Sequence, residues 1–250
     1  MWNTVASHPL EALSSSSAWD DYWETIGTES WLYREQSELY VRKLAAAIPL
    51  RPDMRVLDFG CGFGFVAELL ADRVGEILVW DAAKNMRCHT AARLALHHNC
   101  HPLDLRDPTT APPLRIDAIL VNSVVQYMSR ERFAEWLRIW RSWLAPGAAI
   151  LVSDLVPPNH RVYRDVIDLL RFSFNRGKFQ RTLRQILREL GSYGRKRQNA
   201  PLASYTTDDL QQLAAGAGLK LDILPGNLTH FVGRTTARFS AQSSAGGVVR

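Results

Sequence analysis

Two aspartates and a run of glycines have the types and spacing that most directly indicate chemistry. Asp58 stands two residues before a G-x-G-x-G run that spans residues 60–64. Glycines allow tight turns and close approach of a ligand, and a helix that begins there offers unpaired N–H groups. An acid in this place would repel a pyrophosphate but suits a ligand with an ammonium or sulfonium group. A second acid, Asp81, follows Gly64 by 17 residues, where an acceptor for ribose hydroxyls is expected.

The glycine run has two other interpretations. It could be a plain strand–helix turn, or a dinucleotide-binding loop of the form G-x-G-x-x-G. The spacing in residues 60–64 differs from that fingerprint. The placement of both acids therefore favours a positively charged nucleoside ligand over a dinucleotide.

The elements that must position these residues alternate along the chain. Apolar runs predict strands at 56–57, 77–80, 101–103, 116–121 and 149–152, and helical periodicity predicts helices at 31–48, 65–73, 84–98 and 130–144. This alternation is typical of parallel βαβ units. A helix over 206–215 and closing strands at 219–224 and 230–234 follow. Trp136 and Trp140 are expected in the core, and Trp143 is expected to be partly exposed.

In this order the motifs resemble those of class I S-adenosylmethionine-dependent methyltransferases, in particular the branch that acts on small molecules. The resemblance covers about residues 40–155 well and the closing strands loosely. It implies a Rossmann-like α/β fold with a doubly wound, mostly parallel seven-stranded sheet. It also implies an N-terminal helical lid and a helical insertion after the fifth strand.

The resemblance further implies S-adenosylmethionine as cofactor and S-adenosylhomocysteine as product. In the family, the loop that matches Asp58–Gly64 cradles the methionine part, the acid that matches Asp81 holds the ribose, and a methionine at the place of Met86 packs on the adenine. Asp104 and Leu105 match the residues that meet the adenine amino group. The cofactor set implied in this way is Asp58, Phe59, Gly60, Cys61, Gly62, Asp81, Ala82, Met86, Asp104, Leu105, Asn122, Ser123 and Tyr127.

Two departures from family patterns narrow the chemistry. Residues 122–127 read Asn-Ser-Val-Val-Gln-Tyr rather than the Asn-Pro-Pro-Tyr/Phe of members that methylate planar amide or adenine nitrogens. Asn122 and Ser123 also replace the acids with which catechol-type relatives bind magnesium. The cysteines and histidines of residues 88–89 and 97–101 match no zinc spacing. We therefore expect no metal.

Catalysis and acceptor binding leave more alternatives open. Methyl transfer needs mainly orientation and desolvation, and a base only when the acceptor must lose a proton. The candidate catalytic residues are His160, Tyr127 and Asp154, with His230 as a further base, although each also fits an ordinary polar loop position. A lid of aromatic residues is expected to wall the substrate site, or else simply to fasten the arm to the sheet. The predicted substrate residues are Trp19, Tyr22, Trp23 and Tyr33 of the lid region, Gln126 after the fourth strand, and Phe172 of the basic segment.

The composition sets limits on the class of protein. A chain of 250 residues with 46% hydrophobic residues fits one large or two small α/β domains and excludes wholesale disorder. Three cysteines form no disulfide framework, and neither a signal peptide nor an 18-residue apolar run is found. We therefore expect a cytoplasmic protein without a membrane span.

The net charge of +5 is concentrated in one segment. Residues 161–198 hold eleven Lys or Arg and three acids, and the rest of the chain is slightly acidic. A uniformly basic nucleic-acid binder is therefore not indicated. The segment could be a cap with solvated charges, could bind an acidic small substrate, or could bind RNA or an anionic membrane surface.

These observations predict five regions: an arm with lid helices (1–48), a cofactor-binding core (49–158), a basic helical cap (159–200), the closing helix and strands (201–238), and a flexible tail (239–250). The predicted function is O- or N-methylation of an acidic or aromatic small molecule, as in natural-product biosynthesis, by a monomer or homodimer without nucleic-acid or membrane partners. The alternatives are an RNA-modifying methyltransferase, and a cofactor-binding regulatory or partner protein without turnover.

Overall fold

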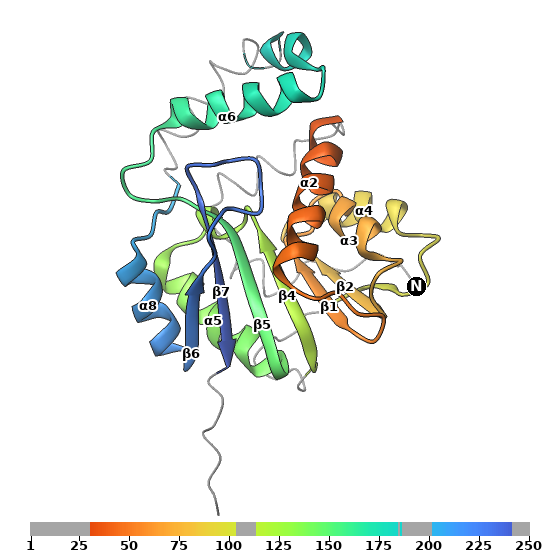
Figure 1. The fold of residues 1–250 in the computed structure, drawn as a ribbon. Helices are drawn as coiled ribbons and strands as arrows, with labels where there is room; N and C mark the ends of the chain where they lie inside the picture. The colour runs from red at the N-terminus through yellow and green to blue at the C-terminus, as the bar shows by residue number, and fades with distance from the viewer. Residues whose placement is uncertain (1–30, 104–113, 185, 187–201, 242–250) are drawn as a thin grey trace, which may run out of the picture.

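A seven-stranded sheet forms the centre of the protein in a computed structural model, which describes residues 31–103, 114–184, 186 and 202–241 (Figure 1). Its strand order is β3-β2-β1-β4-β5-β7-β6, and only the pairings of β7 are antiparallel. The strands are β1 (Arg55–Phe59), β2 (Glu76–Trp80), β3 (Cys100–Pro102), β4 (Ile116–Asn122), β5 (Leu144–Leu155), β6 (Leu219–Ile223) and β7 (Thr235–Ala241). The predicted doubly wound, mostly parallel sheet of seven strands is thus confirmed.

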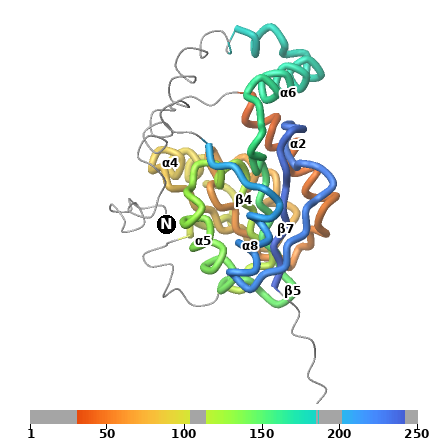
Figure 2. Tube along the Cα trace, turned by 90° about the vertical axis from the view of Figure 1, so that its left-hand side faces the viewer, coloured from red at the N-terminus to blue at the C-terminus, as the bar shows by residue number. Residues whose placement is uncertain are grey.

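Helices cover both faces of this sheet, and one lies above its edge (Figures 1 and 2). On one face lie α2 (Trp31–Ala47), α3 (Phe65–Leu70) and α4 (Lys84–Arg93), and on the other lie α5 (Arg130–Trp143) and α8 (Thr207–Gly216). A 3₁₀ turn, η2 (Val125–Tyr127), follows β4. The chain leaves β5 into α6 (Val162–Asn175), which is a helix inserted after the fifth strand as predicted.

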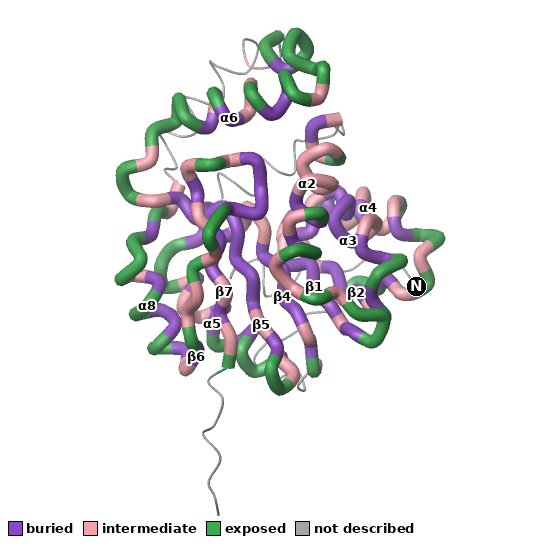
Figure 3. Tube along the Cα trace, in the orientation of Figure 1, coloured by how far each residue is buried: buried purple, intermediate pink, exposed green. Residues whose placement is uncertain are grey.

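Burial on both faces explains why the inner strands read as continuous apolar runs. In β1 the side chain of Val56 belongs to the core cluster beneath α2 and α3, whereas that of Leu57 belongs to the cluster beneath α5 and α8. Figure 3 shows the strands as largely buried. Because β1 and β4 are neighbours from which the chain winds in opposite directions, ligands are expected beyond their carboxyl ends.

The expectation for Trp143 is wrong, because this side chain is fully buried. It follows Trp136 by seven residues, which is two helical turns, so both residues lie on one face of α5. Their rings lie 6.3 Å apart, edge to face. Beneath them, Phe59 stacks on Trp80 with ring centroids 4.5 Å apart.

The position of the last strand also differs from the prediction. Residues 230–234 lie in the β6–β7 loop, and β7 runs from Thr235 to Ala241. Phe239, which was expected in the tail, is fully buried and pairs with Ile150 of β5. The loop carries buried polar side chains, and those of Asn227 and Thr229 bind Asp154 of β5 instead of forming a strand ladder.

None of the described helices is both long and apolar enough to cross a bilayer.

Candidate active site

The loop after β1 has backbone angles that glycine adopts more easily than other residues. Gly60 has a φ of 77°, in the left-handed region. A Cβ on this residue would lie 2.2 Å from Cγ2 of Val124, which follows β4. The N–H groups of Gly60 and Cys61 donate to the carbonyl of Trp80 at 2.7 and 3.1 Å. The loop is thus held against the ends of both neighbouring strands.

Asp81, at the end of β2, is bound to the same loop. Its carboxylate accepts hydrogen bonds from the N–H groups of Gly62 and Ala83, each at 2.9 Å. The hydroxyl of Thr90 donates to the carbonyl of Gly62 at 2.7 Å. The guanidinium of Arg87 donates to the carbonyls of Asp81 and Ala82. A carboxylate can accept about four hydrogen bonds in all, so an acid in this place suits a ligand with hydroxyl groups.

Asp58 is the acid whose surroundings are most unusual. It is 2% exposed, and its Oδ2 has no hydrogen-bond partner among the described residues. Burial, with the charge of Asp81 as a second cause, raises the pKa of Asp58 to about 7, although the N–H of Ala67 acts in the opposite direction. A cationic ligand would supply the missing partner and would stabilise the ionised form.

These residues fit the nucleoside cofactor that the sequence predicts. The orphaned oxygen of Asp58 suits a positive group, and Asp81 suits a ribose. Met86 is 1% exposed and packs with Phe63, Phe65 and Ala83, beside the ring of Tyr33 from α2. The side chain of Phe59 packs into the core instead, so only its backbone can face the loop.

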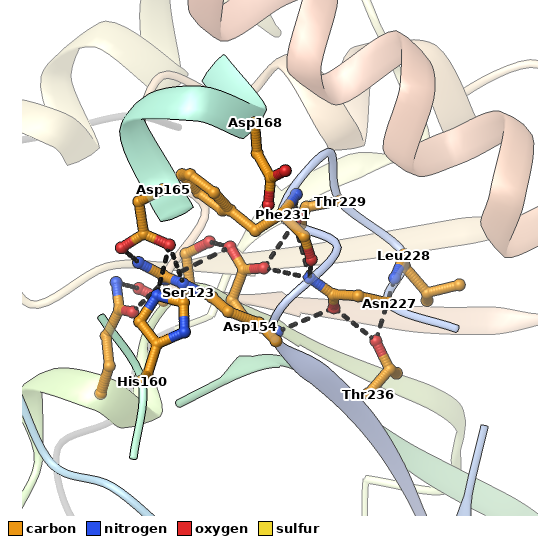
Figure 4. Close-up of polar contacts among 12 residues, drawn as sticks. Ser123, Asp154, His160, Asp165, Asp168, Asn227, Leu228, Thr229, Phe231 and Thr236 are labelled. Carbon is orange, nitrogen blue, oxygen red and sulfur yellow. Dashed lines mark hydrogen bonds and ion pairs between the residues drawn. The ribbon is translucent and has the colours of Figure 1, made fainter. Parts of the chain in front are cut away.

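A second group of predicted residues lies at the ends of β4 and β5 (Figure 4). Ser123 and Asp154 both adopt positive φ, of 59° and 65°, which is rare for such residues. The hydroxyl of Ser123 donates to Oδ2 of Asp154. Oδ1 of Asp154 accepts from the amide of Asn227 and from the hydroxyl of Thr229. Asp154 is thus held by three side-chain donors, which favours a structural role over that of a general base.

The cap helix α6 is fastened to this group by a buried ion pair. Arg234 donates through Nη2 to Oδ2 of Asp165 at 2.8 Å, and through Nη1 to Oε1 of Gln126 at 2.6 Å. Nε2 of His160 lies 2.7 Å from Oδ1 of Asp165. The N–H of Val232 donates to Asp168 at 2.8 Å. Gln126 and His160, predicted for substrate and catalysis, are therefore engaged in holding the cap.

His230 differs from His160 because neither of its ring nitrogens has a partner among the described residues. Its ring lies 5.0 Å from that of Phe172 on α6 and 3.9 Å from that of Phe231. Burial is the largest cause that lowers the pKa of His230 to about 4, and Arg234 adds to it. The imidazole is therefore neutral at pH 7, and it is a weak base.

The other predicted residues have different positions. Tyr127 is half-buried on η2, and Oδ1 of Asn122 is buried without a partner among the described residues. Asp104, Leu105, Trp19, Tyr22 and Trp23 lie outside the described residues. In the part of the chain that is described, no three His, Cys, Asp or Glu side chains are placed to hold a metal ion.

Sequence reasoning missed the buried network itself, namely Asp165, Asp168, Asn227, Thr229 and Arg234. One signal for it was available. Asp165 and Asp168 are the two acids among the basic residues of 161–184. They are three residues apart and therefore lie on one face of a helix. Acids that point inward from such a helix need buried hydrogen-bond donors or a buried cation.

Comparison with known proteins agrees with this geometry. A family model described as a methyltransferase domain matches residues 32–223. Trans-aconitate 2-methyltransferase of Methylobacterium nodulans is 35% identical over 129 residues, which are 49% of this chain and 48% of that protein. The Rhodococcus jostii enzyme of the same name is 29% identical over 134 residues, covering 52% and 51%. The chain spans about half the length of these curated relatives.

Solved structures show the same fold at low identity. Magnesium protoporphyrin IX methyltransferase from Synechocystis, solved with bound S-adenosylmethionine, superposes with a TM-score of 0.56 at 14% identity, over 96% of this chain and 100% of that one. The YcgJ protein of Bacillus subtilis gives 0.52 at 17% identity, over 75% and 70%. Because the family model matches residues 32–223, which are more than half of the chain, the chain belongs to the methyltransferase domain family, and its fold is that of class I S-adenosylmethionine-dependent methyltransferases.

Proposed function

We propose that this protein transfers a methyl group from S-adenosylmethionine to an oxygen of an acidic small molecule. The observation that carries the cofactor part is Asp58, a buried carboxyl of β1 with an orphaned oxygen, two residues before the glycine run. Among the residues that the structure describes, none forms an ion pair with this carboxyl. A ligand with a positive charge is therefore the partner that its position favours.

Different residues around the loop would hold different parts of the cofactor. Asp58 and the backbone of residues 60–62 would hold the charged end, Asp81 the ribose, and the cluster around Met86 would neighbour the adenine. Asp104 and Leu105 remain predicted contacts. When bound, S-adenosylmethionine supplies a methyl group that is already activated for transfer. The chain itself has to orient the acceptor and exclude water.

The acceptor class follows from the state of the candidate bases. Asp154 and His160 are both engaged by buried hydrogen bonds, and the lowered pKa of His230 makes it a weak base. An acceptor that needs no deprotonation therefore suits this site best. A carboxylate oxygen is such an acceptor. The matched curated relatives are named trans-aconitate 2-methyltransferases, which supports an acidic substrate.

A transfer assay with a labelled methyl group tests the proposal. The full chain is incubated with labelled S-adenosylmethionine and either trans-aconitate, a panel of other di- and tricarboxylic acids, primary amines, or RNA. We expect label in an acid as a methyl ester that mild alkali releases. Transfer to amines or RNA alone would contradict the acceptor class, and cofactor binding without transfer to any probe would contradict turnover. The Asp81→Ala variant serves as the control for cofactor dependence.

A further inference from the structure

The cap helix α6 is oriented in an unusual way, with its acids inward. Asp165, Asp168 and Phe172 are each less than 10% exposed and form its protein-facing side. Asp165 pairs with Arg234, and Asp168 accepts the N–H of Val232. An amphipathic helix of a soluble protein normally buries its apolar stripe instead.

The opposite side of α6 presents that apolar stripe to solvent. Tyr163, Ile167 and Phe174 are 58%, 40% and 70% exposed, and their spacing of four and seven residues places them on one face. The stripe continues after α6, where Phe179 and Leu183 are 39% and 38% exposed. The rings of Phe174 and Phe179 lie 6.2 Å apart, edge to face, and so join the two parts.

Every exposed charge of this segment is positive. Between residues 161 and 184 the two acids are buried, and six exposed basic residues surround the stripe. They are Arg161, Arg164, Arg171, Lys178, Arg181 and Arg184. Figure 3 shows much of α6 and of the turn after it as exposed, above an otherwise buried sheet. We name the five apolar residues and these six basic residues the outer cap surface.

We propose that the outer cap surface binds the surface of a membrane that contains anionic lipids. Aromatic and aliphatic side chains can enter the interface between head groups and acyl chains, while Lys and Arg contact the anionic head groups. A two-fold contact between two copies would instead place cations against cations. RNA would leave aliphatic side chains such as Ile167 and Leu183 without a partner.

The fastening of α6 supports this assignment. Arg234 and Asp165 hold the helix from the inner side, and Arg176 pairs with Glu35 of α2. The outer cap surface is thus presented on a fixed element, at the edge of the sheet where β5 ends (Figure 1). Peripheral binding of this kind requires no spanning helix.

Vesicle flotation with the full chain tests the inference, independently of any methyl transfer. We expect the protein to float with vesicles of phosphatidylcholine and phosphatidylglycerol, and not with phosphatidylcholine alone. High salt should release it. Phe174→Ser should weaken partitioning about tenfold, because a Phe side chain loses its apolar burial. Arg171→Gln should weaken it about fivefold.

A matched control separates a specific surface from general stickiness. Leu96 is 87% exposed in the turn after α4, so Leu96→Ser removes an equally accessible apolar group elsewhere. We expect this variant to float as the wild type does. Equal losses in Leu96→Ser and Phe174→Ser would overturn the proposal. Absence of flotation by the full chain, as expected if another segment covers the surface, would also overturn the proposal. RNA binding that Phe174→Ser leaves intact, with no flotation, would overturn it in favour of RNA.

Discussion

Val124 fills the space beside Gly60, so that a Cβ on residue 60 would lie 2.2 Å from its Cγ2 atom. Gly60 follows β1 and Val124 follows β4. The contact thus joins the loop proposed to hold the cofactor to the segment proposed to face the acceptor. Residue 60 is therefore glycine for two separate reasons: its φ is positive, and there is no space for a side chain beside Val124.

Replacing Gly60 should therefore do more damage than replacing Gly62, beside which a Cβ would meet nothing within 4 Å. We expect Gly60→Ala to abolish binding of S-adenosylhomocysteine, and Gly62→Ala to weaken it only through backbone strain of about 1 kcal/mol. The double variant Gly60→Ala with Val124→Ala should recover part of the binding. Calorimetric titration measures all three, and a Gly60→Ala variant that binds normally would show that the contact is unimportant.

Asp58 should make cofactor binding depend on pH. Its pKa of about 7 in the free protein means that the carboxyl is half protonated near neutrality. A cationic ligand favours the ionised form, so affinity should rise as pH increases towards 7 and level off above it. Below pH 7 we expect a decrease approaching tenfold for each pH unit. The Asp58→Asn variant should bind weakly with little dependence on pH, and a wild-type profile like that of the variant would refute the assignment.

The same group should lower the stability of the free protein. A carboxyl whose pKa is raised on folding, here from 3.8 to about 7, favours the folded state less as pH rises through that interval. The free energy of unfolding should therefore gain from Asp58→Asn, by little near pH 4 and by up to about 4 kcal/mol at pH 8. Urea denaturation at both values of pH measures this difference. A gain that does not depend on pH would contradict the buried, ionised Asp58.

The buried pair between Arg234 and Asp165 should be strongly coupled. Arg234→Met leaves Asp165 as a buried charge beside His160 and should cost about 3–5 kcal/mol. Adding Asp165→Asn should recover about 1–3 kcal/mol, because the buried charge that has lost its arginine is then removed. The pair between Arg238 and Asp222 is far more exposed, and Arg238→Met should cost less than about 1 kcal/mol. Denaturant titration measures each variant, and additive single effects would argue against the coupling.

The sheet and the cofactor loop could be predicted because their signals are local. Asp58, the glycine run and Asp81 lie at the ends of apolar strands, and their spacing alone places them at one edge of the sheet. The predicted helix over 206–215 likewise corresponds to α8, at whose start Thr206 and Asp209 form a capping box. The Asp154 network could not be predicted, because Ser123, Asn227 and Thr229 meet only through long-range packing. Residues 230–234 show the same limit. They are predicted as a strand, but Arg234 binds Gln126 and Asp165, which are distant in the sequence.

The central claim is that this edge of the sheet binds S-adenosylmethionine through the two aspartates and the loop between them. Calorimetric titration of S-adenosylhomocysteine into wild type, Asp81→Ala and Asp72→Ala tests it most directly. Asp72 is an exposed acid in the turn after α3 and serves as the matched control. We expect wild type and Asp72→Ala to bind one equivalent with equal affinity, and Asp81→Ala to bind at least about tenfold more weakly, because it loses charge-assisted hydrogen bonds to the ribose and to the loop. Absence of binding by the wild type, or equal affinity of Asp81→Ala, would contradict the account.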